Sequence, residues 1–537
     1  FNETIKLKKN FNILFLTREA IDIFKLIDLV EKEYENYKNL QNLYFKDIDN
    51  VLNESIYGLD LPKIQIKRIL AQWINGKNDG YIFGFEGPPG TGKTTLAKKG
   101  IAKCLKDEFG VERPFIFIPL GGSSNGSTLE GHNYTYVGST WGRIVDGLMT
   151  SKCMNPIIYI DELDKISKTE HGKELIGILT HMTDKSQNSE FMDKYFSGIK
   201  LDISKCLIIF SYNDPNLIDR ILLDRIHRIS IKPLNKKSKL IVAKKHLIPD
   251  ILDNIGYTDQ EIIINDKEIE YIIDKYTYEA GARKLKEKLY EIYRDINLKS
   301  LENYSIIPFT INKDYIEKTF IEYNKNELLQ IYENPIIGTI HGLFATSAGV
   351  GGITIIEAKK FTSKNHLELK LTGMQGDVMK ESMEVSKTLA LSIIPENIRK
   401  KIIASKDTFG IHVHCPAGAT KKDGPSAGTA ITIAIISLLC NIPIKNEIGI
   451  TGEINLNGNM LPIGGLYSKL EGAKIAGIKK VLCPFKNNQD LDKILKENEN
   501  LTDDFFSVEC KNDIYEALEE TLIFKNKKAK QEFLKRQ

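Results

Sequence analysis

The stretch Gly87–Thr94, GPPGTGKT, decides the fold of the first half of the chain. It follows the apolar run YIFGF at residues 81–85 and precedes TLAKKGIAKCL at 95–105, which has helical spacing. A strand, a glycine-rich loop and a helix in this order form the context that a phosphate-binding P-loop requires. The glycines let backbone N–H groups turn inward around phosphates, and the helix N-terminus adds its positive end. We expect the whole loop to contact a nucleotide: Gly87, Pro88, Pro89, Gly90, Thr91, Gly92, Lys93 and Thr94.

Within this loop, Lys93 is expected to reach the β and γ phosphates, and the Thr94 hydroxyl is expected to bind Mg²⁺. A second element, IIYIDELDK at 157–165, is an apolar strand that delivers Asp161 and Glu162 at its C-terminal end. Asp161 suits the Mg²⁺ ion, and Glu162 suits activation of the attacking water. A further apolar strand ends in SYND, which places Asn213 next to that water. The expected cofactors are therefore ATP and Mg²⁺.

The surrounding sequence predicts several domains, because 537 residues at roughly 100–200 per domain allow three to five. Residues 1–50 are predicted to be a helical lead-in. Residues 51–235 alternate helical patterns with short apolar runs, which is typical of a parallel sheet covered on both faces. Residues 236–330 have helical spacing, as in ARKLKEKLYEIY. Residues 331–525 are rich in glycine and alternating strands such as ITIIEA, LELKLTG and IHVHC, and 526–537 form a basic tail expected to be solvated.

The composition excludes several classes of protein. A formal net charge of +3 gives no reason to expect a nucleic-acid-binding protein. The longest mainly apolar stretch, near 429–440, is shorter than the ~20 residues of a membrane-spanning helix. Seven cysteines lie far apart with no CxxC pair, so a disulfide framework or a cysteine zinc site is not expected. Their use favours a reducing compartment.

A candidate nucleophile lies in the second half, where DGPSAG holds Ser426 before the apolar helix GTAITIAIISLL. A serine at the N-terminus of a buried helix is well placed to attack a carbonyl, with backbone N–H groups free to hold the oxyanion. Two kinds of base are available. Lys469 begins a helical stretch, and a lysine in apolar surroundings has a lowered pKa. His412 and His414 share one face of the strand IHVHC. The residues alone leave lysine and histidine equal.

Taken together, these segments resemble the Lon proteases, ATP-dependent serine proteases of the AAA+ superfamily. The resemblance covers about residues 50–525. In the ATPase part it rests on SIYGLD, GPPGTGKT, LEGHNYTYVGSTWGR, IIYIDELDK, LLDR and YTYEAGARKLKE. In the protease part it rests on HVHCPAGATKKDGPSAG and TGEINLNGNMLPIGGLYSKLEGAKIAGIKKVLCP. The form KKDGPSAG is similar to that of the A-type members, and the usual N-terminal substrate-recognition domain is expected to be absent or truncated.

The resemblance implies roles for individual residues. It implies a catalytic pair of Ser426 and Lys469, supported by Thr451 and Asp423. Asn213 would be sensor 1, Arg225 the arginine finger and Arg283 sensor 2. Because the segment after Asn213 is one residue longer than in the family, Arg220 stays an alternative finger. Tyr57 would lie near the adenine, and Tyr136 and Val137 would form the pore loop that grips the substrate. Trp141, beside them, would widen the gripping surface or pack.

The expected fold is a multidomain α/β chain: an AAA+ P-loop parallel sheet with a helical small domain, followed by a mixed α/β Ser-Lys protease domain. The expected function is ATP-dependent unfolding, translocation and cleavage of misfolded or regulatory proteins inside a hexameric ring. The alternative is an ATP-dependent unfoldase whose protease domain is inactive. The expected partners are copies of the chain and unfolded proteins, without membrane or nucleic acid. The expected location is the cytoplasm or the mitochondrial matrix.

Overall fold

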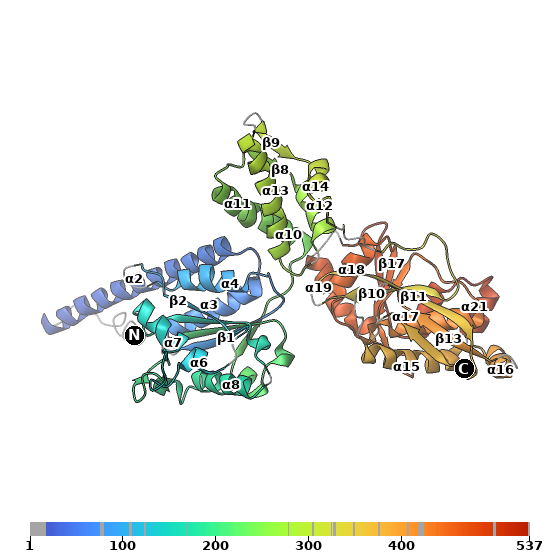
Figure 1. The fold of residues 1–537 in the computed structure, drawn as a ribbon, viewed down its shortest axis with the longest axis horizontal. Coiled ribbons are helices and arrows are strands. Elements are labelled where there is room, and N and C mark those ends of the chain that lie inside the picture. The colour runs from blue at the N-terminus through green and yellow to red at the C-terminus, as the bar shows by residue number, and fades with distance from the viewer. Residues whose placement is uncertain are drawn as a thin grey trace. The chain divides into compact units, whose positions relative to one another are not determined.

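The computed structural model describes residues 18–534, except for 76–79, 107–109, 123–124, 168, 278, 303–305, 324, 326–328, 347–348, 374–375, 405–407, 417–423 and 498–500. The chain divides into two compact units, Phe1–Pro233 and Leu234–Gln537. Each unit is described on its own (Figure 1). The division falls close to the boundary at 235 that the sequence predicts, and the finer division into five parts stays a prediction.

The first unit is built on a five-stranded parallel sheet in the order β2-β3-β6-β1-β7. Its strands are β1 (Tyr81–Glu86), β2 (Phe115–Pro119), β3 (Ile157–Asp161), β6 (Leu207–Tyr212) and β7 (His227–Ser230). All six residues of β6 are buried, as expected for a central strand covered on both faces. The short apolar runs of residues 51–235, which lie at 81–85, 114–120, 155–161 and 206–212, are thus strands, and only β7, with the polar sequence HRIS, carries no apolar signal.

Helices cover both faces of this sheet (Figure 1). One core joins it to helices near the N-terminus, with buried residues such as Leu52, Ile66 and Leu96. The other core joins it to later helices through residues such as Ile144 and Leu179. The helices are α2 (Arg18–Ser55), α3 (Asp60–Asn75), α4 (Lys93–Thr95), α5 (Ala102–Cys104), α6 (Ser127–Glu130), α7 (Arg143–Ser151), α8 (Glu170–Thr183) and α9 (Arg220–Asp224). A π-helical stretch, Leu96–Ile101, makes α4 and α5 one continuous helix. A small hairpin of β4 (Phe191–Met192) and β5 (Lys200–Leu201) completes the unit.

The second unit begins with a small helical body around its own core, which includes Leu285, Leu289 and Ile292. Its helices are α10 (Lys236–Val242), α11 (Ile248–Ile255), α12 (Asp266–Tyr276), α13 (Arg283–Glu302) and α14 (Lys313–Thr319), and β8 (Ile262–Ile264) pairs with β9 (Phe309–Ile311). The side chain of Asn235 accepts from the Ser238 N–H and caps α10, and Gly256 ends α11 in a left-handed conformation. The helical spacing seen in the sequence is confirmed here.

A seven-stranded mixed sheet follows, in the order β12-β13-β11-β10-β14-β17-β18. Its strands are β10 (Thr339–Ala345), β11 (Gly351–Thr362), β12 (Leu369–Thr372), β13 (Phe409–His414), β14 (Ile448–Ile450), β17 (Lys480–Pro484) and β18 (Ser507–Lys511). β15 (Glu453–Ile454) and β16 (Met460–Leu461) form a separate hairpin. The helices are α15 (Asp377–Ile393), α16 (Glu396–Ile403), α17 (Gly428–Cys440), α18 (Leu466–Ile475), α19 (Asn488–Glu497), α20 (Ile514–Thr521) and α21 (Lys527–Leu534).

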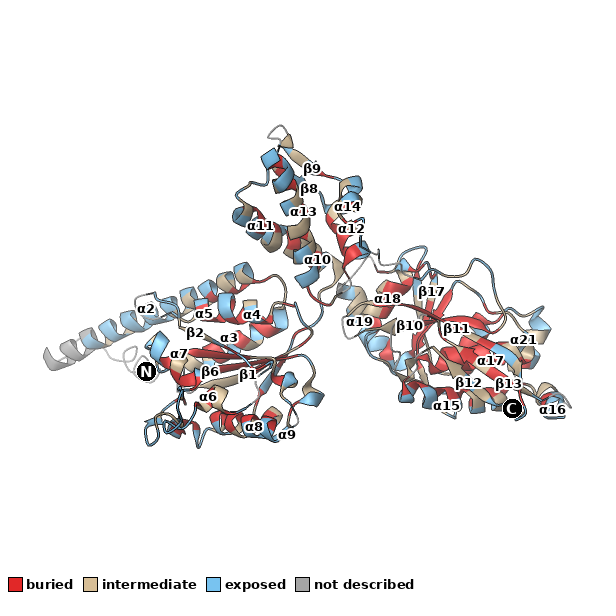
Figure 2. Cartoon of the chain, in the orientation of Figure 1, coloured by how far each residue is buried: buried red, intermediate tan, exposed pale blue. Residues whose placement is uncertain are grey.

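Burial within this sheet domain is centred on α17, which Figure 2 shows almost entirely in red. Its apolar side chains join one large core with strands β11 and β13 and helix α15. A second core on the other side contains Leu470, Val481 and Phe506. The sequence GTAITIAIISLL is therefore the buried helix that its composition predicts.

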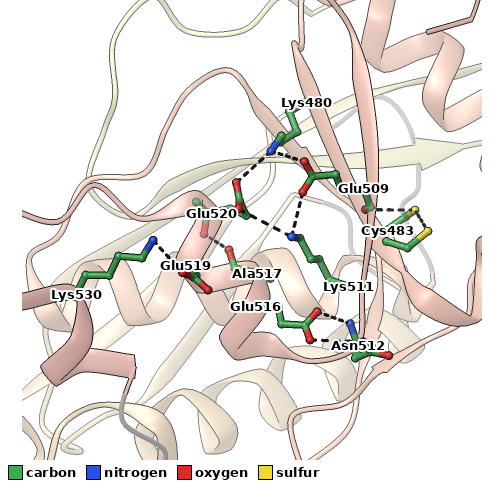
Figure 3. Close-up of polar contacts among 12 residues, drawn as sticks. Lys480, Cys483, Glu509, Lys511, Asn512, Glu516, Ala517, Glu519, Glu520 and Lys530 are labelled. Carbon is green, nitrogen blue, oxygen red and sulfur yellow. Dashed lines mark hydrogen bonds and ion pairs between the residues drawn. The ribbon is translucent and has the colours of Figure 1, made fainter. Parts of the chain in front are cut away.

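The edge strand β18 is held to β17 and α20 by a network of charged side chains (Figure 3). Lys480 on β17 lies 2.6 Å from Glu509 on β18 and 3.1 Å from Glu520 on α20. Lys511 lies 3.0 Å from the same Glu509. Beside this network the thiols of Cys483 and Cys510, opposite each other on β17 and β18, are 3.5 Å apart.

Two further expectations can be compared with the fold. Most described residues of the basic C-terminal tail are exposed or half-buried, as expected, but Phe533 of α21 packs against Phe524 and is only 8% exposed. The helices of the described part of the chain include none with the length and apolarity of a membrane span.

Candidate active sites

The P-loop connects β1 to α4 and has the shape that its glycines permit. Gly92 has a left-handed backbone, with φ of 93°, and a Cβ there would collide with the Ile56 side chain. A Cβ on Gly87 would collide with the carbonyl oxygen of Ile231. The Thr91 hydroxyl donates to the Pro88 carbonyl at 2.9 Å and closes the turn. The loop is thus a tight cradle at a helix N-terminus, the geometry that favours phosphate.

Lys93 points back over this loop. Its amine donates to the Pro88 carbonyl at 3.2 Å and to the Asn213 amide oxygen at 2.9 Å, and it also contacts the Gly87 carbonyl. Only 8% of Lys93 is exposed. Burial lowers the pKa of the Lys93 amine, and the nearby Asp161 and Asp164 carboxylates oppose this effect. The structure therefore brings Lys93 and Asn213, which are 120 residues apart, into one site.

The acidic pair lies at the carboxyl end of β3. The Asp161 side chain accepts from the backbone N–H of Glu162 at 3.0 Å. Glu162 has a left-handed backbone, with φ of 60° and ψ of 42°, which costs energy for a residue with a side chain. The Lys165 amine forms an ion pair with the Glu162 carboxylate. A strained backbone at a carboxylate is typical of a functional position.

Asp164 is a residue that the sequence interpretation left unused. Its Oδ2 accepts from the backbone N–H groups of Asn213 at 3.1 Å and Asp214 at 3.2 Å. These bonds tie the end of β6 to the turn after β3. Asp164 therefore orients the segment that carries Asn213. The signal was present in the sequence, because the acidic motif IDELDK contains three carboxylates and only two were assigned.

The two candidate finger arginines occupy opposite ends of α9. Arg220 is the exposed first residue of the helix, and the Asp219 side chain caps that end. Arg225 follows the last residue, and its guanidinium lies 2.7 Å from the Asp184 carboxylate after α8. Serine and arginine hydrogen bonds hold the pKa of Asp184 well below its usual range. Arg225 is thus paired within its own unit, whereas Arg220 faces solvent.

The remaining nucleotide-related residues are spread over both units. Tyr57 is half-buried, directly after the end of α2 and next to Ile56, which contacts the P-loop. Arg283 begins α13 in the second unit, is largely exposed, and lies 3.5 Å from the Glu287 carboxylate. The roles of both residues stay predictions.

The candidate pore loop projects from the first unit. Tyr136 is 65% exposed and Val137 is fully exposed, in a turn closed by the bond from the Ser139 N–H to the Tyr136 carbonyl at 3.2 Å. The loop base is held by the bond from the His132 N–H to the Thr140 carbonyl at 3.0 Å. Trp141 packs on Tyr195 and Phe196 and donates its ring N–H to Asp146. Tyr136 is therefore not packed inside its domain, and of the two outcomes expected for Trp141 the structure shows packing.

Ser426 lies in the short turn Pro425–Ala427 that leads into α17. The backbone N–H of Gly452 donates to the Ser426 carbonyl at 2.8 Å, and the Thr429 N–H donates back to the Gly452 carbonyl at 3.0 Å. These bonds fix the serine turn against the loop that follows β14. Asp423, three residues before the serine, lies outside the described residues.

Lys469 contacts the same loop, the one that follows β14. It lies in the first turns of α18, is 4% exposed, and its amine donates to the Thr451 hydroxyl at 3.1 Å. Burial lowers the pKa of this amine from 10.5 to about 8. The consecutive residues Thr451 and Gly452 therefore contact Lys469 and the Ser426 turn respectively. A fully buried threonine that accepts from the lysine amine orients it, as the resemblance implies for Thr451.

The histidine alternative has a different arrangement. His412 and His414 both contact the Thr372 hydroxyl, at 2.9 Å and 2.7 Å. They therefore share one face of β13, as predicted. Burial, with help from Lys370 and His414, lowers the pKa of His412. Among the described contacts, the two histidine rings bond to Thr372 on β12. Lys469 instead bonds to the loop that also holds the Ser426 turn. The geometry favours the lysine as the base.

Comparison with known protein families finds matches along most of the chain. Residues 83–234 match the ATPase family associated with various cellular activities (AAA). Residues 253–306 match the Lon protease AAA+ ATPase lid domain. Residues 310–523 match the Lon protease C-terminal proteolytic domain. The candidate nucleotide residues of the first unit from Gly87 onward, and Ser426 with Lys469, lie inside these matched ranges.

Individual proteins show the same similarity. The chain is 36% identical to a protein named Lon protease homolog from Acanthamoeba polyphaga mimivirus, over 88% of this chain and 52% of that protein. It is 39% identical to a Lon protease of Campylobacter jejuni, over 85% of this chain and 58% of that protein. It is 36% identical to a Lon protease of Methanosarcina barkeri, over 84% of this chain and 54% of that protein. The chain thus spans little more than half the length of these relatives.

Proposed function

The chain belongs to the Lon protease family, and on this premise we propose that it is an ATP-dependent serine endopeptidase. In this proposal, nucleotide hydrolysis at the P-loop drives unfolding and translocation of a polypeptide. Ser426 then cleaves that polypeptide. The observation that carries the proposal is the loop Thr451–Gly452, which contacts both the Lys469 amine and the Ser426 turn.

The proposed peptidase step uses Lys469 as a neutral amine. With a pKa of about 8, this amine is partly neutral near physiological pH, whereas an ordinary lysine is almost fully charged. Lys469 takes the Ser426 proton as the serine attacks the peptide carbonyl, and it later returns a proton to the leaving amine. Backbone N–H groups of the turn that leads into α17 would hold the oxyanion, since the Gly428 and Thr429 N–H groups at the start of the helix donate to the Pro425 and Gly452 carbonyls. The Thr451 hydroxyl keeps the amine in place.

The proposed nucleotide site uses the P-loop backbone and Lys93 for the phosphates. Thr94 and Asp161 would hold Mg²⁺, and their hydroxyl and carboxylate oxygens are the hard ligands that this ion prefers. The ion would neutralise charge that develops on the phosphates. Glu162 orients and activates the attacking water, and Asn213, which contacts Lys93, lies beside it. Tyr57 is proposed near the adenine and Arg283 as a sensor of the bound nucleotide.

The finer features are also proposals. We assign substrate gripping to Tyr136 and Val137, because both side chains are exposed at a loop tip. We propose assembly into a hexameric ring, with Arg225 or Arg220 acting on the nucleotide of a neighbouring copy. A reducing compartment, the cytoplasm or the mitochondrial matrix, is proposed from the seven free cysteines, two of them with sulfur atoms 3.5 Å apart. Recovery of Cys483 and Cys510 as a disulfide from the native source would contradict that location.

The competing function is an ATP-dependent unfoldase with an inactive protease domain. A buried lysine with a lowered pKa beside the serine turn argues against it, because a buried amine is costly to keep without a use. The test is degradation of unfolded casein by the purified protein, with and without ATP. Ser426→Ala should lose at least about 10³-fold in cleavage yet keep its ATPase, because the two sites lie in separate units. Equal cleavage by the alanine variant would remove Ser426 from the mechanism.

A further inference from the structure

Tyr159 occupies an unusual place in the first unit. It lies on β3, two residues before Asp161, and is completely buried. Its neighbours on the strand are Ile157, Ile158 and Ile160, all apolar. The rings of Phe115 and Phe117 on β2 lie 5.6 Å and 5.8 Å from its ring. The phenol ring is therefore fixed by packing, and packing alone does not require a hydroxyl there.

The Tyr159 hydroxyl contacts the nucleotide site directly. It lies 3.1 Å from the hydroxyl of Thr94, the residue proposed to hold Mg²⁺. Ser211, a buried polar residue in the otherwise apolar stretch LIIFS of β6, also interacts with this hydroxyl and favours the charged form of the phenol, as a donating hydroxyl does. Burial raises the pKa of Tyr159 to about 12, so the hydroxyl keeps its proton. A chain of three hydroxyls therefore runs from the sheet interior to the exposed Thr94.

The direction of these hydrogen bonds follows from the number of protons that each hydroxyl can donate. A hydroxyl has one proton to donate and lone pairs with which to accept. If the Thr94 lone pairs bind a cation, the Thr94 proton must go to another acceptor, and the Tyr159 oxygen at 3.1 Å is such an acceptor. The Thr94 proton then points into the sheet, and its lone pairs face the P-loop, where a cation requires them. An apolar residue at 159 would leave the Thr94 proton free to point toward the cation.

We propose that Tyr159 is a positioning residue for Mg²⁺, which accepts the Thr94 hydroxyl proton and turns a Thr94 lone pair toward the ion. The inference rests on the proposed nucleotide function of the P-loop. Partners that orient a metal ligand in this way typically change metal affinity 10- to 100-fold when removed.

The test measures equilibrium binding rather than turnover. A fluorescent ATP analogue is titrated onto the protein at increasing Mg²⁺, and the half-saturating Mg²⁺ concentration for tight nucleotide binding is recorded. Tyr159→Phe should raise this concentration about tenfold. Its affinity for the analogue in excess chelator should stay that of the wild type.

The matched control is Tyr293→Phe. Tyr293 is also a completely buried tyrosine, lies on α13 of the second unit, and its hydroxyl has no hydrogen-bond partner among the described residues. Tyr293→Phe should leave the Mg²⁺ dependence unchanged. A double-mutant cycle then separates positioning from general packing. Thr94→Val should itself raise the half-saturating Mg²⁺ concentration, and adding Tyr159→Phe to Thr94→Val should produce no further change.

Three results would overturn the inference. Wild-type Mg²⁺ dependence in Tyr159→Phe removes the role of the hydroxyl. An equal shift with and without the Thr94 hydroxyl shows that Tyr159 acts elsewhere. If Tyr159→Phe does not fold, Thr94→Val decides alone, and an unchanged Mg²⁺ dependence there refutes the proposal. A wild-type protein that binds no nucleotide at all refutes the proposed function of the P-loop instead.

Discussion

At the scale of single residues, the buried amine of Lys469 makes the most direct prediction about activity. It must be neutral to accept the Ser426 proton, and its pKa is lowered to about 8 by burial. The kcat/KM for a short fluorogenic peptide should therefore fall about tenfold for each pH unit below that pKa and level off above it. Lys469→Arg should be nearly inactive, because a guanidinium is not deprotonated in this range.

His414→Ala is the matched control for this profile. His414 bonds to Thr372 rather than to the Thr451–Gly452 loop, so its removal should leave substantial peptidase activity and the same pH profile. An inactive His414 variant together with an active Lys469→Arg variant would establish histidine as the base.

The same amine also affects stability. Folding lowers its pKa from 10.5 to about 8, so the folded state disfavours the charged form, and stability is lost as pH falls through this window. Lys469→Met should therefore be more stable than the wild type below pH 8, by up to roughly 3 kcal/mol. The difference should shrink as pH rises toward about 10.5. Thermal unfolding at neutral and alkaline pH measures it, and a less stable methionine variant at neutral pH would contradict a charged buried amine.

At the scale of an element, the loop between α6 and α7 contains two aromatic residues, Tyr136 and Trp141, that we expect to differ in function. Tyr136 is 65% exposed, so Tyr136→Ala should change the unfolding temperature little. We expect it to spare cleavage of short peptides, which reach the serine by diffusion, and to reduce degradation of folded proteins about tenfold or more. An exposed aromatic ring offers sequence-tolerant contact area at low entropy cost, as gripping requires. Parallel assays with a peptide and a folded substrate measure the difference.

Trp141→Ala is the control within the same loop. Its ring packs on Tyr195 and Phe196, so its removal should lower the unfolding temperature of the first unit. If Tyr136→Ala instead lost thermal stability and ATPase together, the gripping role would fail. Equal loss of peptide and protein cleavage would contradict it as well.

At the scale of the whole molecule, the arginines test whether copies of the chain share a nucleotide site. An arginine supplied by a neighbour can be worth ~10³–10⁵ in rate. Arg225→Ala should therefore bind ATP normally and hydrolyse it scarcely. Mixing it with Lys93→Ala, which lacks nucleotide binding but keeps its arginines, should restore part of the ATPase, because mixed rings contain intact shared sites. Steady-state ATPase of the mixture, with mixed rings confirmed by mass, is the measurement.

Arg220→Ala is the comparison variant, and the structure makes it informative. Arg225 is paired with Asp184 in its own unit, whereas Arg220 is exposed. If Arg225 acts on a neighbour, it must leave Asp184, and Asp184→Asn should not abolish hydrolysis. An inactive Arg220 variant beside an active Arg225 variant would assign the finger to Arg220. No rescue in confirmed mixed rings would count against a shared site.

Much of the fold could be predicted because its signals are local. The runs 81–85, 114–120, 155–161 and 206–212 became β1, β2, β3 and β6, since a strand buried on both faces must be continuously apolar. Strand β7 could not be found this way, because HRIS at the sheet edge needs few apolar residues. The burial of Phe533 was missed because a short basic segment contains one ring whose packing partner, Phe524, lies just before that segment.

The sequence by itself determined the P-loop, the acidic strand end and the buried helix behind Ser426, because each depends on a pattern of consecutive residues. Only the tertiary structure decided which distant groups meet. The Lys93 amine reaches Asn213, Asp164 holds the backbone of Asn213, and Lys469 donates to Thr451 beside the Ser426 turn. It also placed the Tyr159 hydroxyl beside Thr94, 65 residues away. The physical reason is that hydrogen-bond partners and desolvation depend on packing between elements, which local patterns of polarity do not encode.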